Sequence, residues 1–245
     1  MGKPRVALFV TCLVDQFLPN VAESVVKILR RLNVEVTFDP GQTCCGQPAF
    51  NTGYRDEARC VARRVLDMFE DAEYVVAPSG SCTSMVRVFY PELFPDDPIR
   101  QRQCERLSSH FFEFSEFLVN VLKMEDVGAT FRHRVAYHDS CHLLRELRVE
   151  AAPRKLLHNV RGLEFVEIPD NQLCCGFGGT FSVKYPEVSV PMGRDKVRAA
   201  MSTGAEYLVA ADGGCLIHIA GVLHRQGSPL KTLHLAEVLA QQERF

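Results

Sequence analysis

Cysteine is the residue type of this chain that is most able to do chemistry. The chain of 245 residues contains ten cysteines and no tryptophan. Its hydrophobic fraction of 47% and its charged fraction of 24% are otherwise typical of a globular protein with a substantial core. Ten thiols are unusual for a protein without thiol chemistry, and they are too sparse for a small domain held by disulfides. The cysteine content therefore indicates a soft metal centre or a redox process.

Charge and hydropathy exclude several classes of partner. The formal net charge is −2, so no basic excess indicates binding to nucleic acid or to an anionic membrane surface. The apolar run at residues 6–14 is too short to span a bilayer, and no signal-peptide cleavage site follows it. We expect a cytoplasmic chain with no transmembrane segment, in a reducing compartment where stable disulfides are rare.

The sequence repeats itself once. The matched segments, in chain order, are Cys12 with Cys141, Cys44-Cys45-Gly46 with Cys174-Cys175-Gly176, residues 72–77 with 205–210, and Cys82 with Cys215. Their offsets lie between 129 and 133 residues, and their order is the same in both halves. We therefore interpret the chain as a tandem duplication, with one repeat at residues 1–128 and the other at residues 129–245.

Each repeat alternates strands and helices. Apolar runs predict strands at residues 5–11, 34–38 and 74–77 of the first repeat and at 134–138, 165–168 and 207–210 of the second. Apolar residues at helical spacing lie between them, as at Val21, Val25 and Ile28, and residues 186–201 are expected to form a helix. Each half closes with a further apolar segment that we expect in the core. The pattern predicts an α/β fold of two pseudo-repeats, each a small parallel sheet with crossover helices.

The predicted strands bring the cysteines together. In a parallel sheet the carboxyl ends of the strands share one edge, where α/β proteins bind ligands. Cysteines follow every predicted strand and form two sets: Cys12, Cys44, Cys45 and Cys82 in the first repeat, and Cys141, Cys174, Cys175 and Cys215 in the second. We call these the first and second cysteine sets and expect each to form one metal site. Cys60 and Cys104 belong to neither set and are expected to be small buried apolar residues.

Four converging thiolates suit an iron–sulfur cluster or zinc. The chain contains no C-x-x-C knuckle of the kind that zinc ribbons use. Side chains of adjacent extended residues diverge, so they are awkward ligands for a single metal ion. They suit a [4Fe–4S] cubane better, because its irons lie apart. Gly46 and Gly176 allow the sharp turn that such a loop needs. Zinc in at least one repeat, a redox disulfide and plain packing remain as alternatives.

Polar residues near the second set have two interpretations each. His138, Asp139 and His142 flank Cys141 and either handle protons beside a metal centre or cap a helix and hydrogen-bond locally. Three arginines, Arg145, Arg148 and Arg154, either bind a carboxylate substrate or lie on a solvated helix face. No glycine-rich nucleotide fingerprint is present, so neither flavin nor NAD is expected in this chain.

The pattern C-x₃₁-CCG-x₃₅-C, which returns in the second half as C-x₃₂-CCG-x₃₈-C, resembles the tandem CCG domain. That domain occurs in heterodisulfide reductase and in the iron–sulfur subunits of glycolate oxidase and anaerobic glycerol-3-phosphate dehydrogenase. Heterodisulfide-reductase repeats end in C-x-x-C and bind a cluster through five cysteines. Here Ser79 and Asp212 stand at the first position of that pair, so each repeat keeps four cysteines, enough for an ordinary [4Fe–4S] cluster. Asp212 is either an additional oxygen ligand or, like Ser79, a turn residue that caps a helix.

The surroundings of the motifs, among them FVTCLVD, YHDSCH and LCCGFGGTF, are similar to the lactate utilization protein A family. The resemblance implies an iron–sulfur oxidoreductase subunit that takes part in the oxidation of L-lactate to pyruvate. It also implies electron transfer with a ferredoxin-type iron–sulfur subunit and a third lactate-utilization subunit. The alternatives are a heterodisulfide-reductase-like thiol–disulfide reductase subunit and a zinc-bearing, non-catalytic assembly module.

Overall fold

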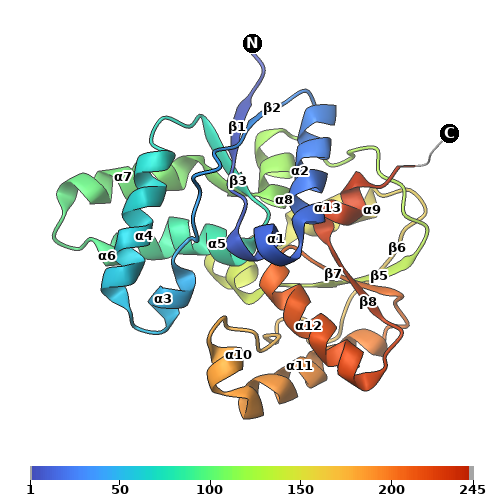
Figure 1. Cartoon of the computed structure of the whole chain (residues 1–245). Coiled ribbons are helices and arrows are strands. Elements are labelled where there is room, and N and C mark those ends of the chain that lie inside the picture. The colour runs from blue at the N-terminus through green and yellow to red at the C-terminus, as the bar shows by residue number, and fades with distance from the viewer. Residues whose placement is uncertain (1, 243–245) are drawn as a thin grey trace.

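The protein contains two parallel four-stranded sheets, one from each repeat, with helices around them (Figure 1). The computed structural model describes residues 2–242. The strand order is β2-β1-β3-β4 in the first sheet and β6-β5-β7-β8 in the second, and every neighbouring pair is parallel. The predicted α/β fold with two repeated parallel sheets is confirmed.

The elements of the first repeat include four strands. These are β1 (Arg5–Leu8), β2 (Glu35–Thr37), β3 (Tyr74–Ala77) and β4 (Phe111–Glu113). The α-helices are α1 (Cys12–Phe17), α2 (Pro19–Arg31), α3 (Gln47–Asn51), α4 (Arg55–Met68), α5 (Gly80–Ser84), α6 (Tyr90–Leu93), α7 (Pro98–His110) and α8 (Phe114–Glu116). Two π-helical turns, η1 (Met85–Phe89) and η2 (Phe117–Val121), continue α5 and α8.

The second repeat follows the same order of strands. These are β5 (Arg134–His138), β6 (Glu164–Val166), β7 (Tyr207–Ala210) and β8 (Lys231–His234). Its helices are η3 (His142–Glu146), α9 (Ala151–His158), α10 (Phe181–Lys184), α11 (Pro186–Met201), α12 (Gly213–Gln226) and α13 (Leu235–Ala240). Within residues 2–242, no helix is both long enough and apolar enough to cross a membrane.

The predicted strands agree with the structure except at the end of each repeat. β3, β5 and β7 have the predicted bounds, and β1, β2 and β6 overlap theirs. The fourth strands, β4 and β8, were not predicted, because each is only three or four residues long and runs directly into an apolar helix. Alternation of polar and apolar residues cannot show in so short a run. The closing segments do lie in the core, as expected: Phe111, Phe114 and Phe117 are fully buried.

In helix α2, the apolar residues that the sequence places at helical spacing form the buried face. Pro19 occupies the first helical position, where its missing N–H is not needed. Val21, Val25 and Ile28 then bury one face completely. The helix ends before Asn33, whose φ of 62° cannot continue it. α2 therefore anchors the first repeat through a single apolar stripe.

The two repeats interlock rather than lying side by side as separate units. α13, from the end of the second repeat, packs on α2 of the first, and α8 and η2 of the first repeat pack on α9 of the second. One continuous buried cluster contains residues from both repeats, among them Val25 and Leu239. The division of the chain into repeats at residues 1–128 and 129–245 stays a prediction. Residue 1 of the first repeat and residues 243–245 of the second lie outside the described range.

A buried carboxyl group ends the first sheet. Glu113 is fully buried, and its Oε2 accepts hydrogen bonds from the backbone N–H groups of Ser115 and Glu116 and from the Ser115 hydroxyl. Its Oε1 has no hydrogen-bond partner among the described residues. Burial raises the pKa of Glu113 to about 8, against an ordinary value of 4.5. The folded chain therefore binds a proton here that the unfolded chain releases.

We expect Glu113→Gln to reduce the pH dependence of stability. Because the pKa is raised on folding, Glu113 favours the folded state at low pH, and this contribution is lost as the pH rises from about 5 to 8. The wild type should lose roughly 3 kcal/mol more than the variant over that interval. Urea unfolding of both metal-free proteins at pH 5 and pH 8 measures the difference. Equal losses in the two proteins would contradict the expectation.

Candidate metal centre

The first cysteine set is assembled from three elements of the first repeat. Cys12 begins α1, Cys44 and Cys45 lie in the loop after β2, and Cys82 lies in α5. The Cys12 Sγ lies 3.6 Å from the Cys44 Sγ and donates a hydrogen bond to it. The Cys44 and Cys45 side chains also interact closely enough to shift each other's pKa, and Cys82 helps to raise the pKa of Cys45. The four thiols therefore lie together and line one cavity.

The second cysteine set repeats this arrangement. Cys141 precedes η3, Cys174 and Cys175 lie in the loop after β6, and Cys215 lies in α12. Cys141 and Cys174 again shift each other's pKa, and Cys174 and Cys215 both help to raise the pKa of Cys175. The structure thus brings together each of the two predicted sets. All ten cysteines are free thiols.

The CCG loops turn sharply at their glycines. Gly46 and Gly176 have φ values of 86° and 91°, in the left-handed region that favours glycine. The turn directs the glycine N–H back to the first cysteine of each pair, with 3.4 Å between the glycine nitrogen and the Sγ of Cys44 or Cys174. Both cysteines of each pair line the same cavity, so any divergence between adjacent thiols does not carry them to opposite sides of the loop.

Shared protons make one thiol of each set acidic. The hydrogen bond from Cys12 lowers the pKa of Cys44, and the same bond raises the pKa of Cys12. The equivalent bond from Cys141 lowers the pKa of Cys174. Because thiolates rather than thiols bind soft metals, the first cysteine of each CC pair is already close to its ligand form.

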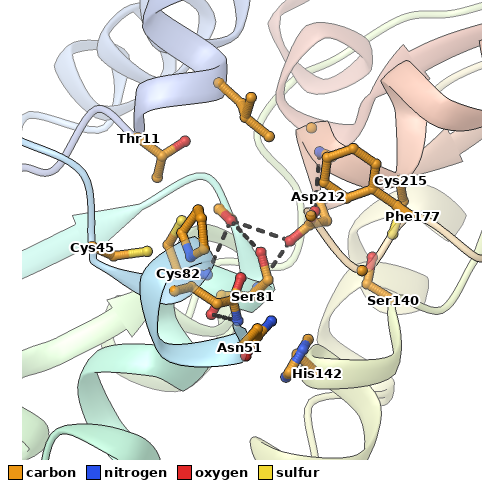
Figure 2. A pocket seen from close by; sticks show the side chains of 18 of the residues that line it. Thr11, Cys45, Asn51, Ser81, Cys82, Ser140, His142, Phe177, Asp212 and Cys215 are labelled. Atoms are coloured by element: carbon orange, nitrogen blue, oxygen red, sulfur yellow. Dashed lines mark hydrogen bonds between the residues drawn. The ribbon is translucent and has the colours of Figure 1, made fainter. Parts of the chain in front are cut away.

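Both cysteine sets open onto one cavity between the repeats. The cavity has a volume of about 300 Å³, and all eight motif cysteines line it. Figure 2 shows Cys45 and Cys82 on one side, and Cys215 and Phe177 on the other. No lysine or arginine is among the described residues that line this space. The sequence predicted two sites, but not that they face each other.

Comparisons with known proteins agree with this geometry. The cysteine-rich domain family CCG matches twice, at residues 6–87 and 135–220, one match per repeat. Lactate utilization protein A from an Exiguobacterium species is 52% identical over 238 residues, covering 96% of this chain and 97% of that protein. Lactate utilization protein A from Bacillus subtilis is 50% identical over 235 residues, covering 96% of this chain and 98% of that protein.

The chain belongs to the lactate utilization protein A family of CCG-domain proteins. A solved structure also shares its fold. A hypothetical protein from Helicobacter pylori superposes with a TM-score of 0.71 at 10% identity, covering all of this chain and 50% of that one. The likeness at this low identity concerns the fold alone. The family resemblance inferred from the doubled motif is confirmed.

Ser79 and Asp212, which stand three residues before Cys82 and Cys215, meet at the boundary between the repeats. Both residues are 3% exposed, and they pair with each other across the repeats as an antiparallel bridge. The Ser79 hydroxyl donates to the Asp212 Oδ2 at 3.1 Å, and the Ser81 N–H donates to the same oxygen at 2.8 Å (Figure 2). Each residue also caps its own helix, Ser79 through the Cys82 N–H and Asp212 through the Gly214 N–H. The Asp212 carboxylate is therefore occupied by hydrogen bonds.

The polar residues before Cys141 do not take the helix-capping and local hydrogen-bonding roles that were one of their two interpretations. Asp139 does not cap η3; it accepts two hydrogen bonds from Arg154, at 2.9 and 2.7 Å, and one from Asn171 at 2.8 Å. His138 was expected to hydrogen-bond locally, yet neither of its ring nitrogens has a partner among the described residues. Burial, together with the Lys196 charge, lowers the pKa of His138 to about 3, so the ring is neutral at pH 7.

The candidate carboxylate-binding arginines lie away from the cavity. Arg154 pairs with Asp139 and with Glu167, and Arg145 donates to the Gln172 carbonyl. Lys196 is a feature that sequence analysis missed, because its position on α11 suggests a solvated residue. It is 1% exposed, and its Nζ donates to the Asn171 carbonyl at 2.9 Å. The polar groups of the second repeat thus form a layer behind the second cysteine set.

The two cysteines outside the sets have different surroundings. Cys104 is 1% exposed on α7 and is a buried apolar residue, as predicted. Cys60 lies on the exposed face of α4, so the prediction that it is buried is wrong. Neither lines the cavity between the repeats.

The two CCG glycines are expected to tolerate alanine unequally. A Cβ at Gly176 would lie 2.5 Å from the Ser189 carbonyl oxygen, whereas the nearest atom to a Cβ at Gly46 is 3.4 Å away. Both substitutions strain a left-handed residue, at a cost of about 1 kcal/mol. Gly176→Ala must also displace backbone, so we expect a loss of about 3 kcal/mol and of second-centre metal. Urea unfolding and metal content of both variants measure this; equal effects would contradict it.

Proposed function

We propose that the chain is an iron–sulfur oxidoreductase subunit that acts in the oxidation of L-lactate to pyruvate. Its relatives are named for lactate utilization, and its two four-thiol sets supply the ligand number of an ordinary [4Fe–4S] cluster. The first centre would use Cys12, Cys44, Cys45 and Cys82, and the second Cys141, Cys174, Cys175 and Cys215. Clusters bound there would supply one-electron transfer.

The residues of each site fit such a group. Four thiols face the cavity, and one in each repeat already has a lowered pKa. A backbone N–H reaches the sulfur of Cys44 and of Cys174, and hydrogen bonds of this kind tune the potential of a cluster. Buried Cys45, Cys82, Cys175 and Cys215 hold the inner side of the sites away from water.

The observation that carries the proposal is the single cavity that both sets share. Oxidation of lactate to pyruvate releases two electrons and two protons. Two centres that face one space suit the uptake of two electrons, one at each centre. The described lining residues include no lysine or arginine for the lactate carboxylate, and the one histidine among them, His142, lies 3.5 Å from the Glu146 carboxylate. We therefore place lactate binding on a partner, and we propose a ferredoxin-type iron–sulfur subunit and a third lactate-utilization subunit as companions of this chain.

Anaerobic purification followed by iron, sulfide and zinc analysis tests the metal assignment. We expect brown protein with about eight irons and eight sulfides per chain if both centres are cubanes. Cys45→Ser and Cys175→Ser should each lower this content, whereas Cys60→Ser, at an exposed position outside the sets, should not. Colourless protein after full reconstitution, without a spectroscopic cluster signal, would overturn the assignment. Addition of L-lactate should bleach the chromophore only when the partner subunits are present.

Zinc is the second candidate, and one distance favours it. Four sulfurs bonded to zinc at about 2.3 Å lie about 3.8 Å apart. The 3.6 Å between the Sγ atoms of Cys12 and Cys44 is close to that spacing. Stoichiometric zinc without iron in anaerobically purified protein would select a zinc-bearing assembly module. A heterodisulfide-reductase-like activity has weaker support, because Ser79 and Asp212 bond each other at the fifth-ligand positions.

A further inference from the structure

The two repeats differ at one buried position beside their cysteine sets. His138, at the end of β5, lies three residues before Cys141, and Phe9 is the residue three before Cys12. Both side chains are fully buried. Phe9 packs edge-on against Phe69 and Phe111, with ring centroids 5.7 Å apart in each pair. The first repeat thus fills this position with an aromatic cluster, whereas the second places an imidazole there.

The imidazole of His138 is unpaired in a place where pairing is normally required. Neither Nδ1 nor Nε2 has a hydrogen-bond partner among residues 2–242, although both are shielded from solvent. An unsatisfied buried polar group costs about 1–3 kcal/mol, so native structures contain few of them. A phenylalanine-like residue would avoid this cost, as Phe9 does in the first repeat. The histidine therefore needs a partner that the protein chain does not supply.

Two thiols of the second set lie beside this unpaired ring. A ring nitrogen of His138 and the Sγ atoms of Cys175 and Cys215 all lie within 4.8 Å of one another. All three residues are buried. One nitrogen and two sulfurs at this separation form part of a coordination shell for a soft metal. The position of His138 outside the cavity lining puts this nitrogen on the inner side of the second site.

We propose that His138 is a nitrogen ligand of the second metal centre, bound on the side formed by Cys175 and Cys215. The inference rests on the proposed function only in assigning a metal to the second cysteine set. It makes the two centres chemically different: the first has only sulfur donors, and the second has sulfur and nitrogen donors. His138 would take the place of one of the two less buried thiols, Cys141 or Cys174, and replacing sulfur by histidine nitrogen raises the potential of an iron–sulfur centre. Electrons would therefore pass from the first centre to the second.

The layer behind the second set supports the same direction of electron flow. Lys196 is buried there and bonded to the Asn171 carbonyl, so its position is fixed. A buried ammonium group favours the more negative, reduced state of a nearby centre. Its counterpart in the first repeat at an offset of 133 is Arg63, which is exposed to solvent.

Nitrogen coordination can be tested on the full chain with ¹⁵N-labelled histidine. Pulsed EPR of the reduced iron-loaded protein, or of Co²⁺-substituted protein if only zinc is retained, should detect a directly bound histidine nitrogen. We expect the coupling to persist in the control Phe9→Leu and to vanish in His138→Leu, which should bind second-centre metal at least about tenfold more weakly. His138→Cys should recover the metal without the nitrogen coupling.

A second readout separates ligation from a structural role. Because His138 makes no hydrogen bond within the chain, metal-free His138→Leu should unfold in urea at the same concentration as the metal-free wild type or higher. Two results would overturn the assignment of His138 as a ligand and leave the proposed function standing. One is metal-bound wild type without nitrogen coupling, and the other is coupling that persists in His138→Leu. Absence of metal from the second set of the wild type would overturn both.

Discussion

Serine in place of Cys82 is expected to remove one metal centre and leave the other intact. Cys82 contacts Cys45 within the first set, and its counterpart Cys215 contacts Cys175 within the second. Serine has the same shape but is a poor ligand for a soft metal at neutral pH. Cys82→Ser and Cys215→Ser should each therefore lower the metal content by about half, because each removes one of two ligand sets.

The same two variants decide whether the shared cavity holds two centres or one. Since all eight thiols line one space, a single larger centre would draw ligands from both repeats, and either substitution would then remove all of the metal. Anaerobic metal and sulfide analysis distinguishes half from total loss. Cys104→Ser is a matched control, because it changes a buried thiol outside the cavity. Total loss in both ligand variants, with full content in the control, would contradict two separate centres.

The architecture of each repeat could be predicted because its signals are local. The doubled CCG motif and the matching apolar runs located β3, β5 and β7, and parallel strands then required their cysteines to meet at one edge. The four cysteines of each set lie within about 80 positions of one another in the sequence. Sequence patterns carry that information even without an alignment.

Contacts between the repeats could not be predicted, because nothing local encodes them. Ser79 and Asp212 meet across 133 positions, and either residue alone looks like an ordinary helix cap. The lack of a partner for His138 is equally invisible in the sequence, where a histidine beside a cysteine suggests several roles. Pseudo-symmetry does supply one usable signal. Aligning the repeats places His138 against Phe9, and such a polar-for-apolar exchange at a buried position indicates a candidate functional residue.

Asp212→Ala is expected to be the most destabilising single change at the boundary between the repeats. The Asp212 carboxylate is 3% exposed and accepts hydrogen bonds from the Ser79 hydroxyl and from the N–H groups of Ser81 and Gly214. Alanine would leave these donors unsatisfied and would uncap α5 and α12 together. Losses of about 1–2 kcal/mol for each of the three donors sum to roughly 3–6 kcal/mol. Ser79→Ala, which removes the bond to Asp212 and the cap on the Cys82 N–H, should cost about 2 kcal/mol.

Unfolding of the metal-free proteins in urea separates this role from metal ligation. If Asp212 acts as a cap, the metal-free variant unfolds at a clearly lower urea concentration than the wild type. The double variant with Ser79→Ala should then be less destabilised than the sum of the single changes by at least about 0.5 kcal/mol, because both remove the same bond. If Asp212 were instead a ligand, stability without metal would be unchanged and only metal content would fall. The three hydrogen bonds to its carboxylate lead us to expect the first result.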